Sequence, residues 1–275
     1  MKVIVNADDL GRNSIVNEAI LRLIDLGVVT SSTVMANGMA YDDAINIVLS
    51  HPEISCGVHL CLDEFSSLLQ SSVFEERGIT NNHYFLKGKI AEVNIDDIIE
   101  DEILNELSAQ VQKIGMSGIS ISHFDSHHHC HTLPNLQNII VRLLDTFAIE
   151  KVRLKCLKTF DMYLHRVRQT NVQSNIKDAG IVKKRNIIKS IRSYHNDLSW
   201  NHYMKNHYVT TDFFCSFLFF YQNLDYMQNH FDNKTIELMC HPGHPDYEQE
   251  SCLLEKFDFK REGCDLISYH SLHKG

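Results

Sequence analysis

The sequence predicts an α/β fold, specifically an irregular (β/α) barrel with parallel strands inside and helices outside, similar in plan to a TIM barrel. Strand-like and helix-like segments alternate for most of the chain. Several of the strand candidates end in polar residues, as strands do at the functional rim of such barrels. We find no fixed-period repeat and no low-complexity linker. We therefore expect one catalytic domain over residues 1–275, with insertions at about 66–94 and 157–234.

The first third of the chain contains the clearest elements. Residues 2–9 (KVIVNADD) form a β-branched run that ends abruptly in polar residues, which is typical of a buried strand. Residues 13–27 have helical apolar spacing and end at Gly27, a common residue just after a helix. The next expected elements are a strand at 28–37, a helix at 41–50 that stops before Pro52, and a strand at 54–62.

The remaining elements follow the same alternation. Residues 97–115 have the apolar spacing of a strongly amphipathic helix. The elements expected after it are a strand at 118–127, a helix at 133–147, and strands at 151–155 and 235–241. The longest apolar run, FFCSFLFFY at residues 213–221, is far shorter than the ~20 residues of a membrane span, so we expect it in the core.

Composition excludes several classes of protein. The formal net charge of -9 argues against a general nucleic-acid binder. The N-terminus has no signal-peptide pattern, and none of the eight cysteines forms a C-x-x-C pair, so we expect reduced thiols and a cytoplasmic protein without a membrane anchor. A homodimer is one assembly that the sequence allows.

Residues 151–192 are markedly basic. They contain twelve lysines and arginines but only two acids, Asp161 and Asp178. A solvated, mobile face is the common explanation for such a segment. The alternative is a positive lid over the functional site or a contact between subunits.

A histidine cluster follows the expected strand at 118–127. SHFDSHHHCH, at residues 122–131, holds five of the 17 histidines. If the chain stays extended here, Asp125, His127 and His129 face one side and His128 the other. Clustering several rings that are costly to bury needs a reason, and metal binding supplies one, although not all of them can bind one ion. We expect Cys130, inside the cluster, and Cys240, before His241, to be buried small hydrophobes rather than ligands.

Two further strand ends carry metal-type side chains. Asp8 and Asp9 end the first apolar strand, so one carboxylate can bind a metal ion while the other stays free as a base. His59 ends the run GVHL. Taken alone, a histidine of the core is the commoner explanation for it.

Six segments in order along the chain carry a family resemblance. They are NADDLG (6–11), VTSSTVMANG (29–38), GVHLCL (57–62), SHFDSHHHCHTLP (122–134), VRL (152–154) and ELMCHPG (237–243). Together they resemble the YdjC-type carbohydrate deacetylases, the diacetylchitooligosaccharide deacetylase-like relatives of polysaccharide deacetylases. The chain departs from the family pattern in VRLKCLK, which lacks a proline after the arginine, and in HPGHPDYEQE (241–250).

The resemblance implies an irregular (β/α) barrel that holds one divalent metal ion, Mg²⁺ or Zn²⁺. The ligands it implies are Asp9, His59 and His127. It implies that Asp8 is the base that activates water, His241 the acid opposite, and Arg153 the arginine that orients the base. The substrate it implies is a small acetylated sugar, which we expect Asn37, Asp125 and His131 to contact.

The residues suit this chemistry on their own terms. A His₂Asp ligand set leaves open positions on the metal ion, and a carboxylate and an imidazole can move the protons of amide hydrolysis. The chain has no G-x-S-x-G elbow and no P-loop, which argues against an acyl-enzyme and against nucleotide hydrolysis. Two alternatives stay open: a metal-dependent hydrolase of another bond, such as a phosphoester, and a sugar- or metal-binding protein without turnover.

Overall fold

A computed structural model describes residues 1–157 and 184–274, and its centre is a parallel β-sheet. Among these residues, seven strands form the sheet in the order β6-β3-β2-β1-β8-β7, with β9 also paired to β1. The strands are β1 (Lys2–Leu10), β2 (Ser31–Val34), β3 (Ser55–Leu60), β6 (Phe124–Ser126), β7 (Phe213–Ser216), β8 (Thr235–Cys240) and β9 (Asp265–Leu266). Every pairing in this sheet is parallel, so the carboxyl ends of the strands meet at one rim.

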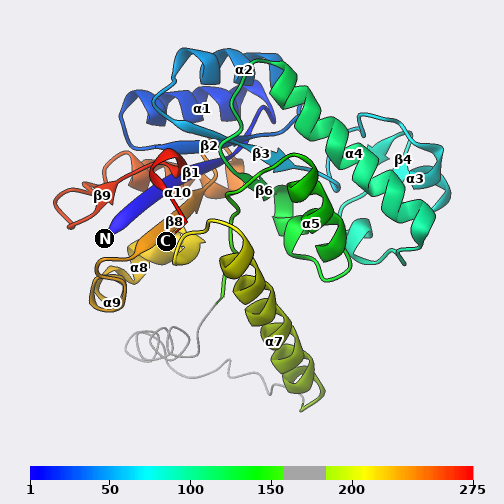
Figure 1. Cartoon of the computed structure of the whole chain (residues 1–275). Helices are drawn as coiled ribbons and strands as arrows, with labels where there is room; N and C mark the ends of the chain where they lie inside the picture. The colour runs from blue at the N-terminus through cyan, green and yellow to red at the C-terminus, as the bar shows by residue number, and fades with distance from the viewer. Residues whose placement is uncertain (158–183, 275) are drawn as a thin grey trace.

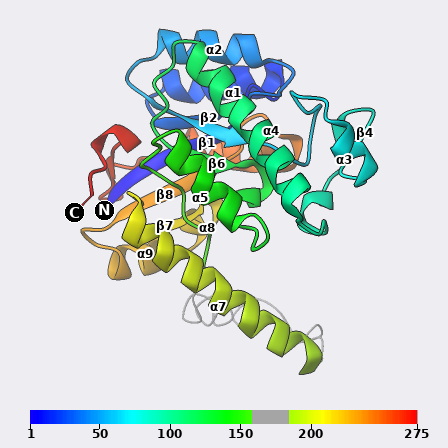
Figure 2. The ribbon, with the colours of Figure 1, turned by 45° about the vertical axis from the view of Figure 1, so that its right-hand side comes forward.

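Helices surround the curved sheet, and Figure 1 shows the long helix at residues 184–207 projecting away from it. They are α1 (Ser14–Asp25), α2 (Tyr41–Ser50), α3 (Ser72–Glu76), α4 (Asp97–Met116), α5 (Gln137–Thr146), α7 (Lys184–His207), α8 (Phe217–Gln222), α9 (Leu224–His230) and α10 (Glu248–Leu254). Figures 1 and 2 both show α1 beside α2 on one flank and α4 beside α5 on another. The expected class, an irregular α/β barrel, is confirmed.

The barrel is irregular because isolated β-bridges, and not regular strands, connect β6 to the segment before β7. Among the residues that the structure describes, the parallel pairing beyond β6 continues through two isolated bridges, from Phe124 to Val152 and from Lys151 to Val209, which lies four residues before β7 begins. The expected strand at 151–155 is therefore reduced to this short contact. The backbone N–H and C=O of Lys155 instead bond to the side-chain amide of Asn201 on α7, at 2.9 and 2.8 Å.

Two other expectations for the strands need correction. The regular strand expected at 118–127 is limited to Phe124–Ser126, with backbone hydrogen bonds to β3 also at Ser122 and His123. The region 157–234, expected to be an insertion, contains β7, which pairs with β8 inside the main sheet. The apolar run at 213–221 does lie largely in the core, but it enters the sheet and then turns into α8.

The excursion at 66–94 stays outside the main sheet. It contains α3 and a separate two-stranded antiparallel sheet of β4 (Thr80–Asn81) and β5 (Tyr84–Phe85). It also contains the short 3₁₀ helix η1 (Lys89–Ala91). The expectation of an insertion at 66–94 stays a prediction.

The basic segment 151–192 is only partly covered by the structure. Residues 158–183 lie outside the described residues, so the choice between a solvated face and a positive lid stays a prediction. Within the described ranges, no helix combines the length and the apolar character needed to cross a membrane.

Candidate metal and catalytic site

A β-bulge at the end of β1 brings two consecutive carboxylates into one cavity. Ala7 pairs with Ser32 and Leu10 with Val34, so β1 contains one residue more than β2 across this stretch. Asp9 has φ 69, the left-handed region. In a regular strand Asp8 and Asp9 would point to opposite faces, but the bulge breaks the alternation. Both side chains consequently line a cavity of about 340 Å³ at the rim.

The histidine cluster also leaves the extended path. β6 ends at Ser126, and the 3₁₀ helix η2 (His127–Thr132) begins at once. His128 and His129 have φ 47 and φ 56, so the expected alternation of His127 and His129 against His128 is wrong. The tight turn instead places all three imidazoles in the cavity wall.

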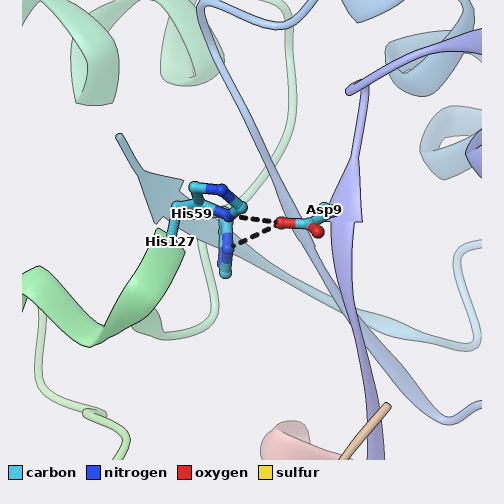
Figure 3. Close-up of side chains that lie close together, drawn as sticks. All are labelled: Asp9, His59 and His127. Atoms are coloured by element: carbon cyan, nitrogen blue, oxygen red, sulfur yellow. Dashed lines mark hydrogen bonds and ion pairs between the residues drawn. The ribbon is translucent and has the colours of Figure 1, made fainter. Parts of the chain in front are cut away.

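Three side chains from three separate elements converge on one point. Figure 3 shows the imidazoles of His59, from β3, and His127, from η2, both facing the carboxylate of Asp9. Asp9 Oδ1 lies 3.1 Å from His59 Nε2 and 2.8 Å from His127 Nδ1. All three residues are buried, and one ligand atom from each falls within 4.8 Å of the others.

This donor set fits a divalent cation. His59 turns Nε2 to the group because its Nδ1 lies 2.7 Å from Asp125 Oδ1, the carboxylate–histidine arrangement that orients metal-binding imidazoles. Burial lowers the pKa of His59, but the Asp125 carboxylate more than offsets this effect and raises it to about 10. Burial likewise lowers the pKa of His127, whose hydrogen bonds to Asp9 and Glu64 raise it to about 9. The surroundings thus favour positive charge here, and a bound cation would replace those imidazole protons.

A second ligand group shares His127 with the first. It combines His127 with Asp63 and His128, whose Nδ1 lies 2.6 Å from Asp63 Oδ2. The His128 side chain is 43% exposed, whereas every member of the first group is buried. The first group is therefore the better enclosed of the two.

Arg153 holds Asp8 in a buried ion cluster. Its Nη1 and Nη2 lie 2.6 Å from the two oxygens of Asp8, a bidentate pair, and Nη1 also lies 2.6 Å from Asp125. Its Nε donates to Glu237 at 2.7 Å. Burial alone would raise the pKa of Asp8, but the Arg153 guanidinium holds it well below its usual range. Asp8 is thereby kept ionised and fixed in orientation.

Replacing Arg153 by methionine is expected to cost several kcal/mol of unfolding free energy. The change leaves three buried carboxylates facing one another without their cation, and breaking a buried pair in this way typically costs ~3–5 kcal/mol. Urea denaturation at neutral pH measures the loss. Arg142→Met is the matched control. Arg142 lies on α5 and forms partly exposed ion pairs with Glu100 and Asp101 of α4, each worth ~1 kcal/mol or less. Equal losses in the two variants would contradict this account of the cluster.

His241 follows β8 directly and also lines the cavity. Its backbone N–H donates to Glu250 Oε2 at 2.8 Å, and its Nδ1 lies 3.7 Å from the same oxygen. Burial lowers the pKa of His241, but the neighbouring carboxylates of Glu250, Asp8 and Asp9 raise it above its usual value. An imidazole whose pKa is raised in this way is suited to act as a proton donor.

The three residues expected to contact substrate lie behind the cavity rather than in its wall. Asp125 is fully buried between His59 and Arg153. His131 is fully buried, with Nδ1 2.5 Å from Ser126 Oγ and Nε2 3.3 Å from the Arg153 carbonyl. Asn37 Nδ2 bonds to the carbonyls of Glu64 and Ser66. In this structure the three side chains contact neighbouring protein groups, and their contact with substrate stays a prediction.

Sequence reasoning missed several residues that complete the site. Glu64 Oε2 lies 2.8 Å from His127 Nε2, and its Oε1 lies 2.7 Å from Arg12, which also reaches Asp9 at 3.3 Å. Glu64 follows β3 in LCLDE, the same strand-end signal that drew attention to Asp8 and Asp9. Glu237 stands alone in the apolar strand TIELMC, where a charge requires a buried partner.

The remaining features of the structure agree with this location. Cys130 and Cys240 are buried as expected, and no candidate ligand group found in the described ranges includes a cysteine. Larger cavities lie elsewhere, of about 620 Å³ between α5 and α7 and about 660 Å³ beside the C-terminal end of α4. Among the described residues neither gathers a group of metal ligands, so size alone does not mark the site.

Known proteins resemble this chain in sequence and in fold. Carbohydrate deacetylases of Brevibacillus brevis and Halalkalibacterium halodurans are each 33% identical, over 151 and 154 residues. These matches cover 54% of this chain and 58% and 62% of the relatives, so the chain spans somewhat more than half their length. A carbohydrate deacetylase of Listeria monocytogenes is 37% identical over 131 residues, 46% of this chain and 51% of the relative.

The structural comparison extends over nearly the whole chain. An Enterococcus faecalis protein, provisionally described as a cellobiose-phosphate cleavage protein, superimposes with a TM-score of 0.67 over 98% of both chains at 22% identity, which establishes likeness of fold. The model of the family described as YdjC-like protein matches residues 2–270. The chain therefore belongs to the YdjC-like family.

Proposed function

We propose that this chain is a metal-dependent hydrolase that removes N-acetyl groups from acetylated amino sugars or their short oligosaccharides. The observation that carries the proposal is the shared cavity. A buried Asp9–His59–His127 group, the Asp8 carboxylate that Arg153 orients, and the His241 imidazole, whose pKa is raised, all line this one cavity. The names of the curated relatives support a carbohydrate as the substrate. We take residues 1–275 as one catalytic domain, because one large hydrophobic cluster of the described residues runs through the barrel and its helices, beside a small second cluster that includes Ile4 and Tyr269.

In the proposed reaction Asp9, His59 and His127 hold one divalent ion. When bound, the ion supplies Lewis acidity, which lowers the pKa of water and polarises the acetyl carbonyl. Asp8, held by Arg153, accepts a proton from the attacking water. His241 donates its proton to the departing nitrogen, so that the sugar leaves as a free amine and acetate remains. Glu64 and Asp125 keep the two imidazoles oriented through the contacts described above.

His241→Ala is expected to remove the alkaline decline of kcat/KM. A general acid works while protonated, so wild-type activity should fall as the pH rises through the raised pKa of His241. The variant should be ~10²–10⁴ slower and should lack that decline, or show it at a different pH. His244→Ala is the control, because His244 lines the same cavity and should leave the decline in place. An unchanged profile in His241→Ala would refute its role as the acid.

Product analysis tests the proposed function. Purified protein is incubated with N-acetylglucosamine oligomers and, separately, with a panel of sugar phosphates, while acetate and inorganic phosphate are measured. The proposal predicts acetate from the acetylated sugars. Phosphate release without acetate would assign the site to a phosphoester hydrolase, and binding of a sugar or a metal ion without either product would make the chain a binding protein.

A further inference from the structure

The segment after β8 lines the cavity with His241, His244, Asp246 and Tyr247, and its turn packs closely against α1. Gly243 has φ 77, and a Cβ there would lie 2.8 Å from the Ile15 carbonyl oxygen and 3.0 Å from Ala19 Cβ, both on α1. Only glycine fits a turn packed this closely. The 3₁₀ helix η3 (Pro245–Tyr247) follows, capped by His244 Nδ1, which accepts from the Asp246 N–H at 3.2 Å. Tyr247 is thereby fixed relative to the barrel.

Tyr247 presents an aromatic ring to the cavity. The ring stacks on His241, with centroids 4.5 Å apart and planes 25° apart, and it meets the His244 ring at 5.2 Å and 64°. Tyr247 is nevertheless 36% exposed and lines the cavity. Apart from imidazoles, it is the one aromatic ring in the described wall, which is otherwise almost entirely charged or imidazole-bearing.

The cavity is too small to enclose a whole oligosaccharide. A volume of about 340 Å³ is near the lower end of ligand pockets, roughly 300–1,000 Å³, so an oligosaccharide cannot enter whole. The parts of a sugar outside the charged interior must rest on the rim. One face of a pyranose ring carries mainly C–H groups, and a flat, partly exposed aromatic ring is the surface that such a face can cover.

We propose that Tyr247 is the platform on which a pyranose ring of the substrate packs. This rests on the proposed function for the identity of the ligand as a sugar. Because the ring contact is made in the bound substrate as well as in the transition state, Tyr247 serves mainly substrate binding.

Kinetics with two kinds of acetamide test the platform. Tyr247→Ala is expected to raise KM for the N-acetylglucosamine trimer about tenfold, with kcat within about threefold of wild type. Tyr247→Phe keeps the ring and should stay near wild type. A small acetamide without a sugar ring, such as N-acetylethanolamine, reports any effect that passes through His241, so Tyr247→Ala should lower kcat/KM for it about tenfold less than for the trimer. Tyr221→Ala, an exposed tyrosine on α8 outside this cavity, is the control.

Binding measurements separate this proposal from the proposed function. Calorimetry of the same trimer compares Asp8→Asn protein with Asp8→Asn/Tyr247→Ala protein, where turnover plays no part. About tenfold weaker binding in the double variant supports the platform, even if wild-type protein releases no acetate. Equal binding, no binding by either protein, or a loss in Tyr247→Phe as large as in Tyr247→Ala would each overturn it.

Discussion

Asp8→Asn is expected to lower kcat for acetate release by ~10²–10⁴ while the protein keeps its metal ion and its fold. Asparagine has nearly the same shape as aspartate, but it cannot take a proton from water. The Arg153 pair would lose its charge and keep part of its hydrogen bonding, so thermal unfolding and metal content are measured on the same samples. A normal metal content with a large loss of kcat isolates the chemical role of the carboxylate.

Asp246→Asn is the matched control for this experiment. Asp246 lines the same cavity but is exposed on η3, away from the cluster that holds Asp8. It should retain nearly full activity. An Asp8→Asn protein that binds metal normally and works within about threefold of wild type would overturn the assignment, because a base worth only ~0.6 kcal/mol of barrier is not acting as one.

His127→Ala is expected to purify with little or no bound divalent metal, and the triple replacement of Asp9, His59 and His127 by alanine with none. Each removed ligand leaves an incomplete buried donor set. Asp125→Asn keeps all three ligands but loses the carboxylate that orients His59, so its metal affinity should fall ~10–100-fold. Metal per chain is measured by elemental analysis after dialysis against the same buffer.

His83→Ala provides the comparison for metal content. His83 lies in the excursion at 66–94, outside every candidate ligand group found in the described residues, and should leave the metal content unchanged. An equal metal content per chain in wild type and in the triple variant would show that Asp9, His59 and His127 are not the metal ligands.

The alternation of the fold could be predicted because burial leaves a strong pattern in sequence. Residues 2–9 and 235–241 are apolar runs that end in polar residues, and both are neighbouring strands of the sheet. The strand at 213–216 could not be recognised with the same ease, because a continuous apolar run shows neither the period of a strand nor that of a helix. The length of the strand expected at 151–155 was overestimated. The backbone of Lys155 bonds to the side chain of Asn201, which is 46 residues away in sequence and gives no local signal.

The location of the site was predictable, and its local geometry was not. Polar residues after apolar strands indicated the rim, and the structure brings Asp9, His59 and His127 together there. Asp9, His128 and His129 adopt left-handed conformations, which are uncommon for any residue other than glycine although Asp and His adopt them more often than most, so periodicity could not reveal them. Two further site residues could have been recognised from the sequence. Glu64 is an acid that follows an apolar strand, and Glu237 is the one charged residue inside the apolar strand β8.

Acetate release by metal-stripped and reloaded protein tests the central claim most directly. The protein is stripped with a chelator and divided, and each portion is reloaded with Mg²⁺, Zn²⁺, Mn²⁺ or Co²⁺ before incubation with the N-acetylglucosamine trimer. The account predicts no acetate from the stripped protein, recovery with at least one ion, and no recovery of His127→Ala under the same conditions. Full activity in the stripped protein, or recovery of His127→Ala equal to that of wild type, would contradict it.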